Sequence, residues 1–374
     1  MTRKLVVKAS RPGAASPQGS RVGSGRVGPR IRRVQVSTSG FTRRRRGRGF
    51  TYLDERGKPI RDPQTVQRIR TLAIPPAWAD VWICPDPWGH LQASGSDAAG
   101  RRQYLYHERW RRWRDRQKFR KMHDFARSLG VLRGRVSRDL DQDGLPKERV
   151  LACAVRLLDL GLFRIGSESY AERNGSFGLA TLRKRHVRLT EDGALFDYTA
   201  KGGKRRVQSI RDPEARKVLR ELKGRRSGGE ELLVYRNGEG WKDVRSSDIN
   251  EYIKEAAGGP FSAKDFRTWH GTVLAAVALA PNDDVGPSLT ARKRAISTAI
   301  RQVAEYLGNT PAIARGSYVD PRILDKFLEG ETIAPAIGRL PPDELPDPSV
   351  RERVESAVLD LIGGSGPPGE REAA

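Results

Sequence analysis

Four residues of this chain carry side chains that together could cleave a phosphodiester without a metal ion: Arg164, Lys201, Arg267 and Tyr318. Two guanidinium groups can bind the nonbridging oxygens of a phosphate through charge-assisted hydrogen bonds. A lysine ammonium can donate a proton to the leaving oxygen, and a phenol can attack phosphorus as a nucleophile. The four side chains therefore supply every group that such a transesterification requires.

The acidic residues do not suggest a metal site. Glu168, Asp265 and Asp320 stand near the four residues, but they are far apart in sequence and resemble helix caps or supports. Guanidinium groups can take the place of metal ions around a phosphate, so we predict no metal and no cofactor.

Each of the four residues also has an ordinary structural interpretation when it is taken alone. Arg164 could cap a helix C-terminus, Lys201 could be an exposed turn residue, and Arg267 could form a salt bridge within a helix. Tyr318 could be a half-buried tyrosine with a hydrogen-bonded hydroxyl. Their order, spacing and sequence contexts favour the chemical interpretation only when they are considered together.

Apolar periodicity and turn residues predict the elements that must position these side chains. A helix with one apolar face ends at Gly161, just before Arg164. Three strands follow at residues 184–190, 194–200 and 204–210, which places Lys201 in a glycine-rich hairpin turn. A helix over 288–307 stops at Gly308.

Two helix start signals flank Tyr318 in the sequence. Thr310 followed by Pro311 begins a short helix, and Asp320 followed by Pro321 begins another. Tyr318 is therefore predicted to lie at a junction between helices, where a side chain can be exposed and moved.

The sequence as a whole predicts an α+β protein with two lobes that form a clamp. We predict a basic disordered arm (1–48), a small domain of β-sheet plus helix (49–128), a larger mainly helical domain containing a three-stranded hairpin sheet (129–340), and a C-terminal helix with a flexible tail (341–374). The arm holds 14 Lys or Arg and no Asp or Glu, and its composition cannot support a core.

Charge points to a nucleic-acid partner. The formal net charge is +25 and the sequence pI is about 10.6, and such a surplus favours a polyanion through counterion release. We expect DNA or RNA as the partner and no membrane association. The two cysteines, Cys84 and Cys153, fit neither a disulfide framework nor a zinc site, and they suit a reducing cytoplasm.

From about residue 49 to 330 the chain resembles the type IB DNA topoisomerases of bacteria and poxviruses. The matching motifs are Arg164-Ile165-Gly166, Ala200-Lys201-Gly202, Lys264-Asp265-Phe266-Arg267-Thr268, Gly308-Asn309-Thr310-Pro311 before Tyr318, and, nearer the N-terminus, Ile74-Pro75-Pro76-Ala77-Trp78 and residues 100–106. Two positions depart from the poxvirus pattern. Asn309 replaces a His, although its amide can donate the same hydrogen bond, and Thr272 replaces an Asn.

The resemblance implies a metal-free and ATP-independent mechanism. Tyr318 attacks the DNA backbone to form a 3′-phosphotyrosine, Lys201 protonates the leaving 5′ oxygen, and Arg164, Arg267 and Asn309 stabilise the transition state, with Lys264 assisting. It also implies duplex DNA as the partner of a monomeric clamp, with DNA contacts from Gln103, Tyr104 and Tyr106. The predicted DNA-binding set is completed by Arg101, Arg102 and Tyr170.

Two alternatives remain at this point. A tyrosine recombinase or integrase uses a similar Arg, Lys and Tyr set, but its second Arg usually follows a His at the position where this chain has Lys264. A non-enzymatic nucleoid-binding protein would satisfy the charge, and it would give Tyr318 no special role.

Overall fold

The computed structural model describes residues 30–36, 39–280, 288–338 and 348–363. The chain divides into two compact units that meet between Trp113 and Arg114. This division falls earlier than the predicted boundary at residue 128. It lies inside one long helix, α2 (Glu108–Leu140).

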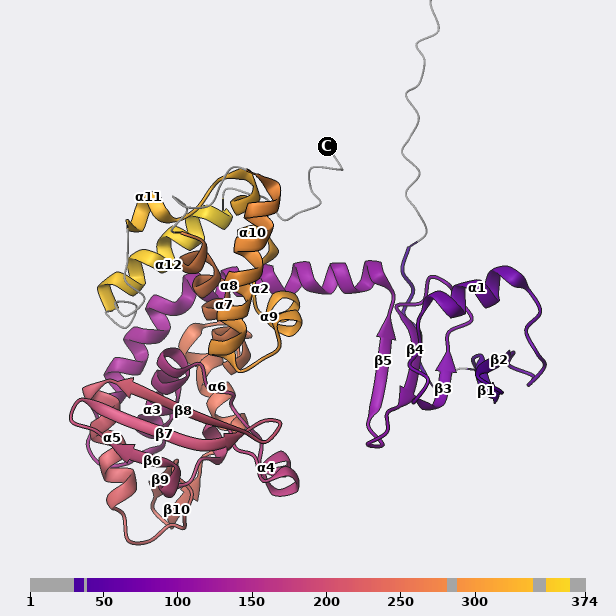
Figure 1. The fold of residues 1–374 in the computed structure, drawn as a ribbon. Coiled ribbons are helices and arrows are strands. Elements are labelled where there is room, and N and C mark those ends of the chain that lie inside the picture. Colours follow the sequence, from indigo (N-terminus) through magenta and orange to yellow (C-terminus); the bar gives the residue numbers. More distant parts are fainter. Residues whose placement is uncertain (1–29, 37–38, 281–287, 339–347, 364–374) are drawn as a thin grey trace, which may run out of the picture. The chain divides into compact units, whose positions relative to one another are not determined.

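The first unit contains two antiparallel sheets and one short helix (Figure 1). The two-stranded sheet pairs β1 (Thr42–Arg46) with β2 (Gly49–Leu53), and the three-stranded sheet has the order β3 (Ala79–Ile83), β4 (Leu91–Ser96), β5 (Arg102–Tyr106). Helix α1 (Pro63–Thr71) begins at Asp62, whose carboxylate accepts from the Thr65 backbone N–H. Ile69, Val81, Ile83 and Ala93 form the centre of one small core.

The arginine run 43–46 lies in a strand, not in the disordered arm that was predicted to extend to residue 48. Arg43 donates to the carbonyls of Ile74, Pro75 and Trp78, and its guanidinium lies 4.1 Å from the ring centroid of Phe50. Local composition could not show these long-range acceptors. Residues 1–29 lie outside the described residues.

The second unit combines helices with two small antiparallel sheets. Its strands are β6 (Val187–Leu189), β7 (Gly193–Ala200) and β8 (Lys204–Arg211) in one sheet, and β9 (Val234–Asn237) and β10 (Gly240–Asp243) in the other. Its helices are the remainder of α2, α3 (Lys147–Gly161), α4 (Glu168–Asn174), α5 (Pro213–Gly224), α6 (Ser246–Ala257), α7 (Ala263–Leu279), α8 (Leu289–Leu307), α9 (Pro311–Ser317), α10 (Pro321–Glu329), α11 (Ala334–Ile337) and α12 (Pro348–Gly363). The α+β class is thus confirmed, including the predicted three-stranded sheet.

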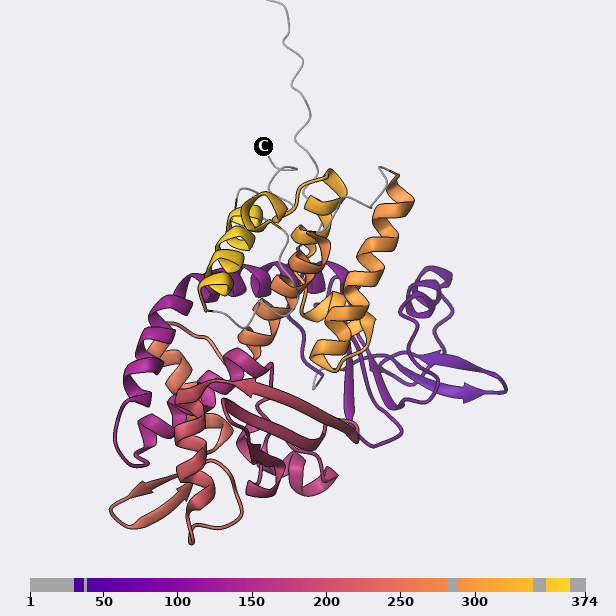
Figure 2. The same ribbon diagram turned by 60° about the vertical axis from the view of Figure 1, so that its left-hand side comes forward.

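Helix α3 lies at the centre of this unit. It packs against α5, α6, α7, β8 and β9, and its side chains from Val150 to Leu158 are almost all buried. In Figure 2, α8 and α10 rise beside α7 on the side of the β6–β8 sheet opposite to β9 and β10. Because α3 ends at Gly161, the rigid core leads directly into the segment that carries Arg164.

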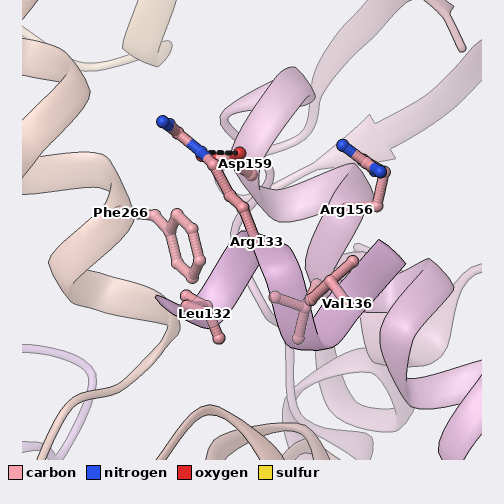
Figure 3. Close-up of a pocket in the computed structure, with 7 residues that line it drawn as sticks. Leu132, Arg133, Val136, Arg156, Asp159 and Phe266 are labelled. Carbon is pink, nitrogen blue, oxygen red and sulfur yellow. Dashed lines mark hydrogen bonds and ion pairs between the residues drawn. The ribbon is translucent and has the colours of Figure 1, made fainter. Parts of the chain in front are cut away.

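A network of buried ion pairs fastens α12 to the rest of the unit. Arg133 of α2 lies 2.9 Å from Asp159 of α3 and 2.6 Å from Glu355 of α12, and Arg351 also bonds the Asp159 carboxylate. Figure 3 shows the Arg133 guanidinium directed at Asp159 beside Leu132 and Phe266. Burial acts to raise the pKa of Asp159, but Arg351 and Arg133 hold it well below its ordinary value. The carboxylate therefore stays charged at neutral pH, although it is buried.

Within the described residues, no helix combines the length and the apolar character needed to cross a membrane.

Candidate active site

Helix α7 carries Arg267 into the interior of the second unit. The residue is only 4% exposed, and its two terminal nitrogens donate to the backbone carbonyls of Leu162 and, at 2.8 Å, Leu307. The guanidinium carbon lies 5.2 Å from the ring centroid of Tyr318. Burial, followed by the charge of Arg164, lowers the pKa of Arg267 to about 10, so the side chain remains a cation at neutral pH.

The carbonyl of Leu162 reaches Arg267 because the backbone turns left-handed there. Leu162 has φ of 54° and caps the C-terminus of α3, a conformation that costs a non-glycine residue about 1 kcal/mol. The sequence prediction gave this capping position to Gly161, which instead is the last helical residue. A Cβ on Gly161 would lie 2.3 Å from the Phe163 ring and 2.8 Å from Gln208 Nε2, so glycine is needed there for close packing.

Arg164 and Asn309 meet through a direct hydrogen bond. One Arg164 nitrogen donates to the carbonyl of Gly308 at 2.9 Å and to the side-chain oxygen of Asn309 at 2.5 Å. Because that oxygen accepts from arginine, the amide nitrogen of Asn309 points elsewhere. This nitrogen is buried and has no hydrogen-bond partner among the described residues, and the same holds for Nε of Arg267. Buried donors without acceptors are rare in proteins, and a bound ligand or water is one way in which such donors are satisfied.

The predicted helix signals around Tyr318 are confirmed. Helix α8 ends at Gly308 with φ of 61°. Thr310 caps α9 by accepting from the Ile313 N–H, and Asp320 caps α10. Tyr318 is the C-terminal cap residue of α9, and it is half-buried.

Helix α7 also holds the backbone on both sides of the phenol. The hydroxyl of Thr272 accepts from the Asp320 N–H at 3.1 Å and lies 3.3 Å from the Tyr318 carbonyl oxygen. A Cβ on Gly271 would lie 2.7 Å from that same carbonyl oxygen. Arg267, Gly271 and Thr272 thus place one helix against both the ring and the main chain of Tyr318.

The structure brings Arg164, Arg267, Asn309 and Tyr318 together, whereas the two lysines lie at the surface. Lys201 occupies the turn between β7 and β8, followed by Gly202 and Gly203 with φ of 81° and 73°, and its side chain is exposed. Lys264 lies exposed in the first turn of α7.

The predicted DNA-binding residues of the first unit divide between the two faces of β5. Tyr104 and Tyr106 are 47% and 43% exposed, and their rings stack with centroids 6.3 Å apart. Gln103 lies on the other face, and its amide donates to Asp97 at 2.9 Å. The remaining members of the set are engaged or undescribed: Arg101 pairs with Asp97, Arg102 donates to Ser94, and the side chain of Tyr170 is not among those described.

Sequence analysis missed two basic residues near the site. Lys118 of α2 donates to the carbonyl of Gly316 at 3.1 Å, a contact across 198 residues that leaves no local signal. Arg206 of β8 donates to the side chain of Gln208 at 2.6 Å and to the carbonyl of Tyr306 at 2.8 Å. The strand prediction contained a signal for Arg206, because period-2 alternation places it on the same face as the buried Ile210.

The arginine cluster has no carboxylate of its own. Among the described residues, Arg164, Arg206 and Arg267 form no ion pair with Asp or Glu, although the charge of Arg164 acts to lower the pKa of both Arg267 and Arg206. No group of His, Cys, Asp or Glu suited to a metal is found in the same part of the chain. Several guanidiniums without anions, beside a phenol, form a site that can bind and attack a phosphate.

Comparisons with known proteins point in the same direction. Residues 107–329 match the family described as eukaryotic DNA topoisomerase I, catalytic core, and residues 49–97 match the bacterial DNA topoisomerase IB, N-terminal domain. The chain is 30% identical over 294 residues to a DNA topoisomerase 1B of Acanthamoeba polyphaga mimivirus, which covers 75% of this chain and 85% of the relative. It is 23% identical over 276 residues to the DNA topoisomerase 1B of vaccinia virus (strain Copenhagen), with coverage of 71% and 83%.

Proposed function

The chain belongs to the type IB DNA topoisomerase family, and we propose that it relaxes supercoiled duplex DNA by reversible cleavage of one strand through a 3′-phosphotyrosyl intermediate. The observation that supports this most directly is the position of the Tyr318 ring, 5.2 Å from the guanidinium of a buried Arg267. That arginine belongs to a cluster that forms no ion pair with a carboxylate of the described residues, so a DNA phosphate can neutralise it.

In the proposed cleavage step, the phenolic oxygen of Tyr318 forms a bond to phosphorus and the bond from phosphorus to the 5′ oxygen breaks. The phenolic proton leaves to water, and the ammonium of Lys201 gives a proton to the departing oxygen. Arg164, Arg267 and the free amide N–H of Asn309 donate to the nonbridging oxygens as charge develops on them. Lys264 assists phosphate contact from the start of α7.

Resealing is the reverse reaction. The 5′ hydroxyl attacks the phosphotyrosine, Lys201 takes the proton back, and Tyr318 is released. The phosphodiester energy is conserved in the tyrosyl bond, so we expect no requirement for ATP. The guanidiniums supply the positive charge at the phosphate, so we expect no requirement for a divalent metal ion. While the strand is open, the duplex rotates and loses supercoils.

The remaining parts of the proposal concern DNA binding. We propose that the first unit contacts DNA through Tyr104, Tyr106 and the neighbouring basic residues, and that the two units close around the duplex as a monomer. Both cysteines are buried free thiols, which suits a reducing, nucleoid-associated setting in the cytoplasm.

The test is plasmid relaxation in EDTA by the wild-type protein and by Tyr318→Phe, which removes one hydroxyl. Tyr306→Phe is the matched control, because Tyr306 is 54% exposed and close in sequence. We expect Tyr318→Phe to lose relaxation and the covalent protein–DNA adduct, and Tyr306→Phe to keep both. Relaxation that survives in Tyr318→Phe would refute the mechanism and favour a non-enzymatic DNA-binding protein. A requirement for particular recombination sites would favour a recombinase.

A further inference from the structure

Arg206 lies on β8 beside Arg164, and none of the roles assigned so far includes it. We propose that Arg206 is a further phosphate-binding residue of this site and that it contacts the DNA backbone next to Arg164. This inference rests on the proposed function, since it assumes that DNA occupies the cluster.

The geometry leaves one nitrogen of Arg206 close to Gly308. Its Nε donates to Gln208 and its Nη2 to the carbonyl of Tyr306, at 2.6 and 2.8 Å, so the side chain is held at two points. The remaining nitrogen, Nη1, lies 3.3 Å from the position that a Cβ on Gly308 would occupy, and Nη1 of Arg164 lies 3.6 Å from the same position. Because residue 308 has no side chain, both guanidiniums can lie beside it and close to each other.

An anion that contacts both guanidiniums would remove an electrostatic conflict. Burial lowers the pKa of Arg206; the neighbouring Tyr198 opposes this effect, and Arg164 adds to it. Two cations that face one space repel each other until a negative group lies between them. A phosphate fits because its oxygens can accept from both guanidiniums at once.

Arg205, the adjacent residue on β8, offers a comparison because it is exposed to solvent. Arg205 points to the other face of β8 and forms two hydrogen bonds with Asp197, at 2.9 and 2.6 Å. A carboxylate is thus provided for Arg205, whereas the described residues provide none for Arg206.

Gln208 links Arg206 to the segment that carries Arg164. Gln208 accepts from Arg206 and donates through its own amide to the carbonyl of Gly161 at 3.0 Å, where α3 ends. The bond to the Tyr306 carbonyl ties Arg206 to the end of α8, close to Gly308 and Asn309. Arg206 is therefore fixed relative to both segments that deliver the phosphate ligands.

The experiment measures equilibrium binding to a short duplex over a range of salt concentrations, in a Tyr318→Phe background so that no cleavage occurs. Loss of one phosphate contact reduces the slope of log K against log salt by about 0.9. We expect this reduction for Arg206→Ala. Arg206→Gln should give the same reduction, and it keeps a long polar side chain, so it tests the proposal even if the alanine variant folds poorly. Arg205→Ala removes the same charge from the opposite face of β8 and should change the slope much less.

A second measurement uses single-turnover cleavage with Tyr318 present, where we expect Arg206→Gln to slow adduct formation by about tenfold, the cost of one charge-assisted hydrogen bond. A slope for Arg206→Gln that equals the parent's, or that changes only as much as the slope for Arg205→Ala, would overturn the proposal. Failure of the proposed function gives a different result: Tyr318→Phe would still relax plasmid DNA, whatever the salt slopes show.

Discussion

The segment that carries Tyr318 and the turn that carries Lys201 are built in opposite ways. Tyr318 follows a capped helix, and α7 contacts both its ring and its main chain through Arg267, Gly271 and Thr272. Lys201 is exposed at the tip of a hairpin, followed by two glycines in left-handed conformation. The proposed nucleophile and phosphate ligands are therefore held by the core of the unit, whereas the proposed acid lies on an exposed turn.

This difference separates two tasks of the proposed reaction. Charge stabilisation benefits from groups that are fixed before the substrate arrives. If the proton donor approaches only after DNA is bound, the catalytic site is incomplete in the protein without DNA. The following predictions test whether the two regions divide the work in this way.

The largest effect is expected at the fixed region. Replacement of Arg267 by Ala should slow adduct formation by about 10³-fold, the range found when one transition-state donor is removed. Arg267→Lys should form the adduct almost as slowly, because an ammonium lacks the planar array of donors that binds two carbonyls and a phosphate at once. Single-turnover cleavage measures both variants. The exposed Arg301 on α8 is the control, and an equal loss in Arg301→Ala would contradict the assignment.

At the turn between β7 and β8, Lys201→Ala should slow cleavage by about 10²-fold, within the range for general-acid catalysis. A substrate in which sulfur replaces the leaving 5′ oxygen should restore the rate, because a thiolate leaves without a proton. Arg267→Ala should not be restored by this substrate. Lys204 on the other side of the turn provides the control, and the comparison fails if the sulfur substrate rescues both variants or neither.

A smaller effect is expected for Asn309, which bridges the two tasks by contacting Arg164 and offering a neutral donor. Asn309→Ala should slow cleavage by about tenfold, as expected for one lost hydrogen bond to a charged group. Asn309→His introduces a side chain that titrates near pH 6.5, so its cleavage rate should fall as pH rises above that value. The wild-type pH–rate profile should lack this step, and identical profiles would show that residue 309 does not face the phosphate.

The smallest expected effect concerns the support of the tyrosine. A Cβ on Gly271 would lie 2.7 Å from the Tyr318 carbonyl, so Gly271→Ala should shift that segment and lower stability by about 1–3 kcal/mol. Gly134→Ala in α2 is the control, because a Cβ there meets nothing within 4 Å. That change should be neutral or stabilising in a helix. Denaturant unfolding of both variants measures the difference, and equal behaviour would show that the close approach carries no constraint.

Sequence reasoning recovered those parts of this site that depend on local signals. The order of Thr310, Pro311, Asp320 and Pro321 determined the junction at Tyr318, because caps and prolines act over a few residues. The hairpin around Lys201 followed from glycines between alternating strands in the same way.

The failures all involve partners that are distant in the chain. Gly161 was predicted to cap the helix, but Leu162 has the left-handed conformation, and Gly161 packs closely against Gln208, 47 residues away. Arg206 was assigned only to a strand, because its contact with Tyr306 spans 100 residues. The run 43–46 was assigned to disorder, since the carbonyls that bind Arg43 are more than 30 residues away.

The ion pairs of α12 have a consequence for how the protein is made. Arg133 and Asp159 are synthesised long before Glu355 and Arg351, their buried partners on the last described helix. Before α12 is made, Arg133 and Asp159 still pair with each other, but the rest of the ion-pair network is missing. During translation, the unit that holds Tyr318 therefore completes this network only after α12 has left the ribosome.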